Sequence, residues 1–177
     1  VVVNLDKAAP TIDVSGDIES FKQNDTVTIT ASAGISGISR VAVKKDDGSY
    51  NDITSSYISG YTVTENGTYI FRITNGANLK ATDSITYTKL DSAKPVVSID
   101  SNDYIQDTWT NGDVTLTVSN TASNLGTTTF QYSTDNANWS SYTGAITIGS
   151  DTNTTYYFKA ISAAGVESNV ESIVVKL

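Results

Sequence analysis

The stretch DTVTITASA, Asp25 to Ala33, alternates apolar and polar side chains at every second position. Val27, Ile29 and Ala31 fall on one face, and threonine and serine fall on the other. A period of two residues is typical of a β-strand with one buried and one solvated face. A near copy, DVTLTVSN, occupies residues 113–120 with the same alternation. The sequence therefore predicts two equivalent strands, one in each half of the chain.

These two strands belong to a repeat that spans the whole chain. Pro10 and Pro95 lie 85 residues apart, in the junctions NLDKAAPTIDV and KLDSAKPVVSID. An offset of 87 residues relates VTIT to VTLT, Tyr69 to Tyr156, Phe71 to Phe158, and Leu90 to Leu177. Self-similarity at a fixed spacing indicates repeated structural units. We predict one domain at residues 6–90 and a second at residues 91–177, with residues 1–5 as the end of a preceding repeat in a longer array.

Each unit reads as a series of short strands. After the first alternating strand, Val41 and Val43 point inward in the first unit, and DDGS, Asp46 to Ser49, supplies a hairpin turn. The runs YTVTE, GTYIFRIT and SITYTK follow, and they contain Phe71 as a core residue, with Phe158 as its counterpart. No window keeps the 3.6-residue apolar period of a helix. About seven strands in about 85 residues predict an all-β fold, an antiparallel sandwich in each unit.

Composition excludes several classes of function. The chain has no Cys and no His, which removes thiol catalysis, thiolate metal sites and the commonest general base. A net charge of −8 argues against nucleic acid and anionic membranes as partners, and no apolar run is long enough for membrane insertion. Dinucleotide glycine loops and a nucleophile elbow are absent. We therefore expect no enzyme and no cofactor.

Acidic residues concentrate in the second unit. The first unit has 10 acidic and 8 basic residues, and the second has 9 and 3. The acids near the start of the second unit are Asp91, Asp100, Asp103, Asp107 and Asp113. Their spacing matches no calcium loop, and calcium needs six to eight converging oxygen ligands. We interpret them as a solvated acidic surface rather than a metal site.

The second unit carries a family resemblance. Its segments YSTDNANWSSYTGAITI and TTYYFKAISAAGVES resemble the immunoglobulin-like or fibronectin-III-like tandem repeats of Gram-positive cell-surface proteins. The first unit resembles the same family, with Tyr50 where Trp139 stands. Asn136 replaces the usual turn Gly, and Val166 follows Gly165 in place of Asn. The resemblance implies two immunoglobulin-like, Greek-key sandwiches in a secreted or wall-attached bacterial protein, and says little about a ligand.

Six aromatic residues are given a structural or a ligand-binding role. Tyr50 and Trp139 follow a hairpin turn, and we expect them to close one end of each core rather than to stack on a sugar. Tyr69 and Tyr156 resemble the tyrosine corner of Greek-key sandwiches, whose hydroxyl bonds to nearby backbone. Tyr104 and Trp109 form the best candidate for an exposed ligand-binding pair.

The leading functional hypothesis is a spacer or stalk module, located extracellularly at the cell surface or wall. Its partners would be the neighbouring repeats of the same chain, and the chain would be monomeric. The junction Asp91 to Pro95 predicts an end-to-end rod with a limited hinge there, because five residues span at most about 18 Å. The alternative is an adhesin or a carbohydrate- or protein-binding module, whose partner would be a host or matrix protein or a glycan.

Overall fold

The computed structural model describes residues 5–177, which form two compact units that divide between Leu90 and Asp91. The repeat spacing divides the sequence at the same bond. We refer to residues 5–90 as unit 1 and to residues 91–177 as unit 2. The predicted end of a preceding repeat falls on residues 1–5, of which only Leu5 is among the described residues. It has no regular secondary structure.

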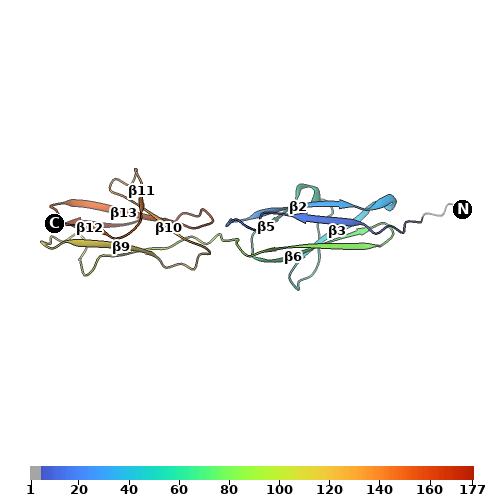
Figure 1. The fold of residues 1–177 in the computed structure, drawn as a ribbon, viewed down its shortest axis with the longest axis horizontal. Coiled ribbons are helices and arrows are strands. Elements are labelled where there is room, and N and C mark those ends of the chain that lie inside the picture. Colours follow the sequence, from blue (N-terminus) through green and yellow to red (C-terminus); the bar gives the residue numbers. More distant parts are fainter. Residues whose placement is uncertain (1–4) are drawn as a thin grey trace. The chain divides into compact units, whose positions relative to one another are not determined.

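Unit 1 consists of two antiparallel sheets, with the orders β1-β2-β5 and β4-β3-β6-β7. Figure 1 shows the two layers, with β2 in one and β6 in the other. Its strands are β1 (Thr11–Ser15), β2 (Asp25–Ser32), β3 (Ile38–Lys45), β4 (Asn51–Asp52), β5 (Tyr61–Val63), β6 (Gly67–Asn75) and β7 (Lys80–Tyr87). Two single-turn 3-10 helices, η1 (Gly34–Ser36) and η2 (Tyr57–Ser59), lie in its loops.

Unit 2 has the same arrangement, with the orders β12-β9-β8 and β11-β10-β13-β14. Its strands are β8 (Val97–Asp100), β9 (Val114–Asn120), β10 (Thr129–Ser133), β11 (Ser140–Tyr142), β12 (Ile146–Ile148), β13 (Asn153–Ile161) and β14 (Glu171–Lys176). All the paired strands within the described sheets of both units run antiparallel.

The core of each unit lies between its two sheets. In unit 1, Val27 of β2 and Phe71 of β6 have no exposed surface, and both belong to one cluster. In unit 2, Leu116 of β9 and Phe158 of β13 take the same positions and are also fully buried. The alternation seen in the sequence thus turns one face of each strand toward the opposite sheet. The predicted fold class, an all-β chain of antiparallel immunoglobulin-like sandwiches, is confirmed.

The chain enters and leaves each unit at opposite ends. In unit 1, the entry segment at Asp6 bonds to Ser36, whereas the exit residue Leu90 bonds to Asn66. The nine-residue strand β6 runs from the exit end, at Gly67, to the entry end, at Asn75. A strand of this length spans about 27 Å. Unit 1 therefore carries the chain from one end of the sandwich to the other (Figure 1).

Unit 2 carries the chain across its sandwich in the same way. Asp91 bonds to Leu125 at the entry end, and Leu177 pairs with Thr152 at the exit end. The nine-residue strand β13 begins next to Thr152 and ends at Ile161.

Candidate functional site

The Asp of the repeated junction fastens the entry segment to the body of unit 1. The Asp6 carboxylate accepts hydrogen bonds from the backbone N–H of Ala8 at 3.0 Å and of Ser36 at 3.1 Å, and from the Ser36 hydroxyl. The buried Asn75 side chain donates to the Ala8 carbonyl at 3.1 Å. The Ser36 hydroxyl, followed by the backbone donors, lowers the pKa of Asp6. We call this arrangement the entry clamp.

Unit 2 has the same clamp built around Asp91. Its carboxylate accepts from the backbone N–H of Ala93 at 2.8 Å and of Leu125 at 2.7 Å. Asn124 replaces Asn75, donating to the Ala93 carbonyl at 2.6 Å and to Asp91 at 3.2 Å. Burial of Asp91 raises the pKa of its carboxyl, but the donors outweigh burial and lower the pKa overall. The repeated motif Asp-x-Ala-x-Pro therefore serves as a clamp.

The two clamps change the interpretation of the junction. Asp91 is only 8% exposed and accepts a bond from Leu125, and just after Pro95 the Val96 carbonyl accepts from the Thr121 N–H at 2.9 Å, so the segment Asp91 to Pro95 is attached to unit 2 on both sides. Leu90 is held in unit 1, where the Asn66 side chain accepts from its N–H at 2.8 Å and donates to its carbonyl at 2.9 Å. Leu90 is therefore attached to unit 1 and Asp91 to unit 2, and the end-to-end rod with a limited hinge at Asp91 to Pro95 stays a prediction.

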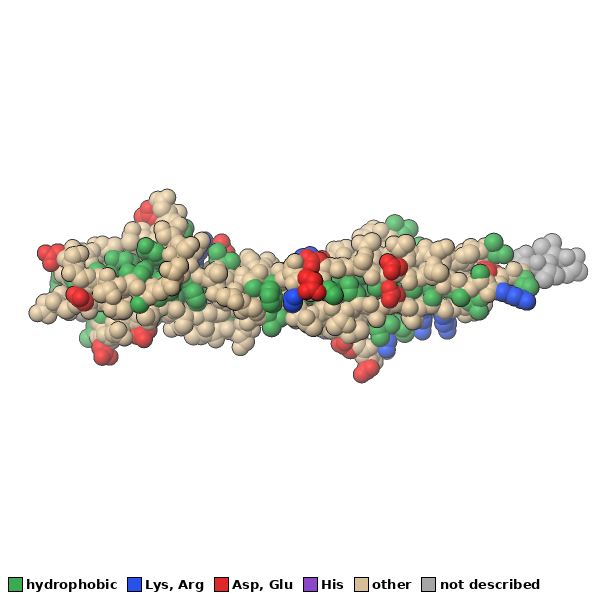
Figure 2. Space-filling view, viewed as in Figure 1, with side chains coloured by type: hydrophobic (Ala, Val, Ile, Leu, Met, Phe, Trp, Pro, Cys, Tyr) green, Lys and Arg blue, Asp and Glu red, His purple; other side chains and the backbone are tan. Residues whose placement is uncertain are grey.

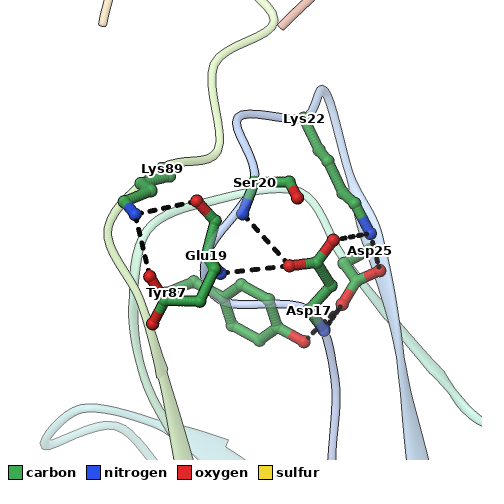
Figure 3. A network of polar contacts seen from close by, with 7 residues as sticks. All are labelled: Asp17, Glu19, Ser20, Lys22, Asp25, Tyr87 and Lys89. Atoms are coloured by element: carbon green, nitrogen blue, oxygen red, sulfur yellow. Dashed lines mark hydrogen bonds and ion pairs between the residues drawn. The ribbon is translucent and has the colours of Figure 1, made fainter. Parts of the chain in front are cut away.

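A polar network closes the exit end of unit 1 (Figure 3). Asp25, at the start of β2, accepts from the Tyr87 hydroxyl at 2.8 Å, from the Asp17 N–H at 2.8 Å and from the Lys22 ammonium at 3.1 Å. Lys22 also pairs with the Asp17 carboxylate at 3.0 Å. At the edge of the same network, Lys89 donates to the Glu19 carbonyl at 2.8 Å. The network joins the loop after β1 to the end of β7.

The charges of this network favour its ionised form. The bond from Lys22 is the largest of the interactions that lower the pKa of Asp17. Burial raises the pKa of Asp25, but donation from Tyr87 and Lys22 outweighs it and lowers the pKa overall. Burial, and then the bond to Asp25, raises the pKa of Tyr87. Gly16 leaves the space for this contact, because a Cβ there would overlap the Tyr87 hydroxyl. Each group is bonded to a complementary partner, so the arrangement suits a structural lock rather than catalysis.

The exit end of unit 2 is closed by Tyr104 instead. Its hydroxyl accepts from the Lys176 N–H at 3.0 Å and lies within donor range of two carbonyls, Thr108 at 2.9 Å and Val174 at 3.1 Å. Its ring packs against the core of unit 2. Trp109 is 68% exposed and does not belong to that core. The expected exposed pair of Tyr104 and Trp109 is therefore wrong, because Tyr104 is committed to the fold and only Trp109 faces solvent.

A shallow hollow of about 390 Å³ opens beside Tyr104, between β8 and β14. Ser101, Glu171 and Ile173 are among its lining residues. Glu171 pairs with Phe158 as Asp83 pairs with Phe71, so the two acids are equivalent. In unit 1, Asp83 accepts from the N–H of Val14 at 2.9 Å and links β7 to β1. Glu171 instead lines the open hollow of unit 2. The two equivalent acids therefore have different surroundings in the two units.

The hairpin aromatics lie on the outside of the sandwiches. Tyr50 stacks on the Arg72 guanidinium, 3.8 Å from its ring centroid, and Trp139 lies 4.9 Å from the Lys159 ammonium. Neither ring belongs to a core cluster. The expectation that Tyr50 and Trp139 close the core ends is therefore wrong. They cover basic side chains on the outer face of the sheet.

The remaining predicted structural residues differ between the units. Tyr69 donates its hydroxyl to the Glu65 carbonyl at 2.9 Å, four residues earlier, as a tyrosine corner requires. Tyr156 is half-buried against the core of unit 2, and its hydroxyl makes no hydrogen bond within residues 5–177. Phe71 and Phe158 are fully buried.

The entry clamps and the exit network had different signals in the sequence. The recurrence of Asp6 and Ala8 as Asp91 and Ala93 was visible, and Asp two residues before a backbone donor is a common turn element. The exit network carried no such signal, because unit 2 does not repeat it.

Within the described part of the chain, no three acidic side chains converge closely enough to hold a metal ion. No described helix is long and apolar enough to cross a membrane.

No family model and no curated protein matches the chain. Among solved structures, it is similar to the fibronectin(III)-like modules of Clostridium thermocellum CbhA, with 11% identity, a TM-score of 0.43, and 94% of each chain covered. It is also similar to three N-terminal domains of the bacteriophage RB49 Highly Immunogenic Outer Capsid protein (Hoc), with 19% identity and a TM-score of 0.43. That match covers 96% of this chain and 59% of the other.

Proposed function

We propose that the chain is a pair of non-catalytic spacer modules in a larger secreted or wall-attached bacterial surface protein. The observation that carries this proposal is the path of the chain through each unit. Entry and exit lie at opposite ends of both sandwiches, separated by about the length of a nine-residue strand. A unit of this kind adds its own length to the distance between whatever precedes and follows it.

The clamps and the exit network support the same role. A spacer must keep its ends attached to its body, because a frayed end would act as a flexible linker. Asp6 and Asp91 attach the entry segments, and Asn66 attaches Leu90. Because the sequence has no Cys, none of these attachments depends on a disulfide.

Single-molecule energy transfer tests the spacer role. Because the chain has no Cys, Leu5→Cys and Leu177→Cys provide two unique dye sites. Two strand-length units joined in series give a separation above about 55 Å, and hence low transfer efficiency. A double variant labelled at Leu5 and at the exposed Thr88, near the exit end of unit 1, provides the shorter reference distance. If the full-length pair shows the same efficiency as this reference, the chain folds back on itself and the spacer proposal is wrong.

A further inference from the structure

The outer face of the four-stranded sheet of unit 1 gathers basic side chains. Val41, Val43, Phe71 and Ile73 point into the core, so the alternate positions of β3 and β6 lie on the outer face of the sheet. The outward basic residues are Arg40 and Lys44 of β3, Arg72 of β6 and Lys80 of β7. Basic side chains also line the lower edge of unit 1 in Figure 2. Four of the eight basic residues of unit 1 thus share one face of a chain whose net charge is −8. We call this set the basic face.

Most of this charge is not neutralised. Arg40 pairs with Asp52 at 2.8 Å. Lys44, Arg72 and Lys80 take part in none of the salt bridges within residues 5–177. They occupy three successive outward positions along the strand direction, and such positions are about 7 Å apart. The free charges therefore form a spread-out array rather than a point.

An aromatic ring and hydroxyl groups lie among these charges. Tyr50 is stacked on Arg72, and its ring centroid lies 5.7 Å from the Lys44 ammonium. Stacking fixes the plane of the guanidinium and leaves its N–H edge able to form paired bonds to a carboxylate or sulfate. Along β7, the outward side chains of Thr82, Ser84 and Thr86 are exposed hydroxyls.

We propose that the basic face binds a linear acidic polysaccharide. Its charged groups would bond to Lys44, Arg72 and Lys80, while the exposed hydroxyls of β7 would bond to sugar hydroxyls. A protein partner fits less well, because protein interfaces have an apolar centre. The described large apolar side chains that are exposed lie elsewhere: Leu5, Ile18, Ile35, Ile58, Val96, Ile105, Trp109, Leu125 and Val170.

Unit 2 does not repeat this surface. The position of Arg72 is taken by Lys159, which pairs with Glu167 at 3.2 Å and lies beneath Trp139. The position of Lys44 is taken by Ser133, which is buried. The proposed site therefore belongs to unit 1, is distinct from Tyr104 and Trp109, and does not depend on the spacer role.

Calorimetric titration of the intact chain tests the proposal. The probes are dextran sulfate, uncharged dextran and polyglutamate, each at about 50 mM and about 200 mM salt. We expect binding of dextran sulfate that weakens at the higher salt, no binding of dextran, and weaker binding of polyglutamate. The double variant Lys44→Ala with Lys80→Ala should lower the affinity for dextran sulfate about fivefold or more.

The matched control is Lys7→Ala with Lys94→Ala, which removes the same charge away from the basic face. It should change the affinity less than twofold. The proposal is overturned if dextran sulfate does not bind at low salt, or if the control weakens binding as much as the test variant. Equal or tighter binding of polyglutamate would also overturn it, because the face would then recognise an acidic polypeptide.

Discussion

Units 1 and 2 share an entry clamp but close their exit ends in different ways. At the entry, Asp6 and Asp91 accept equivalent backbone hydrogen bonds. At the exit, unit 1 uses the ionised network around Asp25, whereas unit 2 uses the Tyr104 hydroxyl and backbone carbonyls. The geometry that passes the chain through each sandwich is therefore common to both units. The interactions at the exit end differ between the units, but in both they attach the last strand to the loop that follows the first strand.

The largest effect should come from the two core rings. Phe71→Ala and Phe158→Ala should each lower the free energy of unfolding of their own unit by about 3–5 kcal/mol, because each deletes a fully buried ring. Both tryptophans lie in unit 2, so fluorescence follows unit 2 while circular dichroism follows both units. Phe71→Ala should leave the fluorescence-detected transition in urea in place. A shift of that transition would show that the two units do not unfold independently.

The clamp of unit 2 should give the next largest effect. Asp91→Ala should lower the stability of unit 2 by about 1–3 kcal/mol, because the N–H groups of Leu125 and Ala93 lose their acceptor. Asp6→Ala should likewise lower the stability of unit 1, because the N–H groups of Ala8 and Ser36 lose their acceptor. The control is Ser92→Ala, at an exposed neighbouring position, which should change stability by less than about 0.5 kcal/mol. Urea unfolding followed by fluorescence measures the unit 2 variants, and equal effects of Asp91→Ala and Ser92→Ala would contradict the clamp.

Removing the Tyr69 or Tyr156 hydroxyl should have a smaller effect on stability, and this effect should differ between the two units. Tyr69→Phe removes the bond to the Glu65 carbonyl and should cost about 1 kcal/mol. Tyr156→Phe should cost close to nothing, because the Tyr156 hydroxyl has no partner within residues 5–177. Thermal unfolding of both variants measures the difference. A loss for Tyr156→Phe as large as that for Tyr69→Phe would show that unit 2 also has a tyrosine corner.

Lowering the pH should reduce the stability of unit 1 more than that of unit 2. In the folded state, hydrogen bonds lower the pKa values of five carboxyl groups in unit 1, against two in unit 2. Those of unit 1 are Asp6, Asp17, Asp25, Asp52 and Glu65, and those of unit 2 are Asp91 and Asp135. Asp17 and Asp25 belong to the exit network. A group with a lowered folded pKa contributes stability that is present above its unfolded pKa of about 3.9 and lost as the pH falls through the folded value. Urea unfolding between about pH 5 and pH 2 should show unit 1 losing stability first. If unit 2 loses stability at a higher pH than unit 1, the exit network does not contribute to the stability of unit 1 as we expect.

The repeat made the fold predictable, since the period-two strands and the 87-residue offset specify which face of each strand is buried. Phe71 and Phe158 were placed in the cores by this argument alone. The position of Tyr50 and Trp139 was not predictable in this way, because a residue after a turn can lie on either face of the sheet. The exit network escaped prediction because it joins Asp17 and Asp25 to Tyr87, which is 62 residues away from Asp25, and because unit 2 does not repeat it.

Small-angle scattering of the intact chain tests the spacer account most directly. A single compact globule of 177 residues would have a radius of gyration of about 16 Å. Two units that each carry the chain from one end to the other, with no free linker residue between their attachments, predict a value above about 20 Å. They also predict a distance distribution with a long tail. A radius near 16 Å with a symmetric distance distribution would contradict the account.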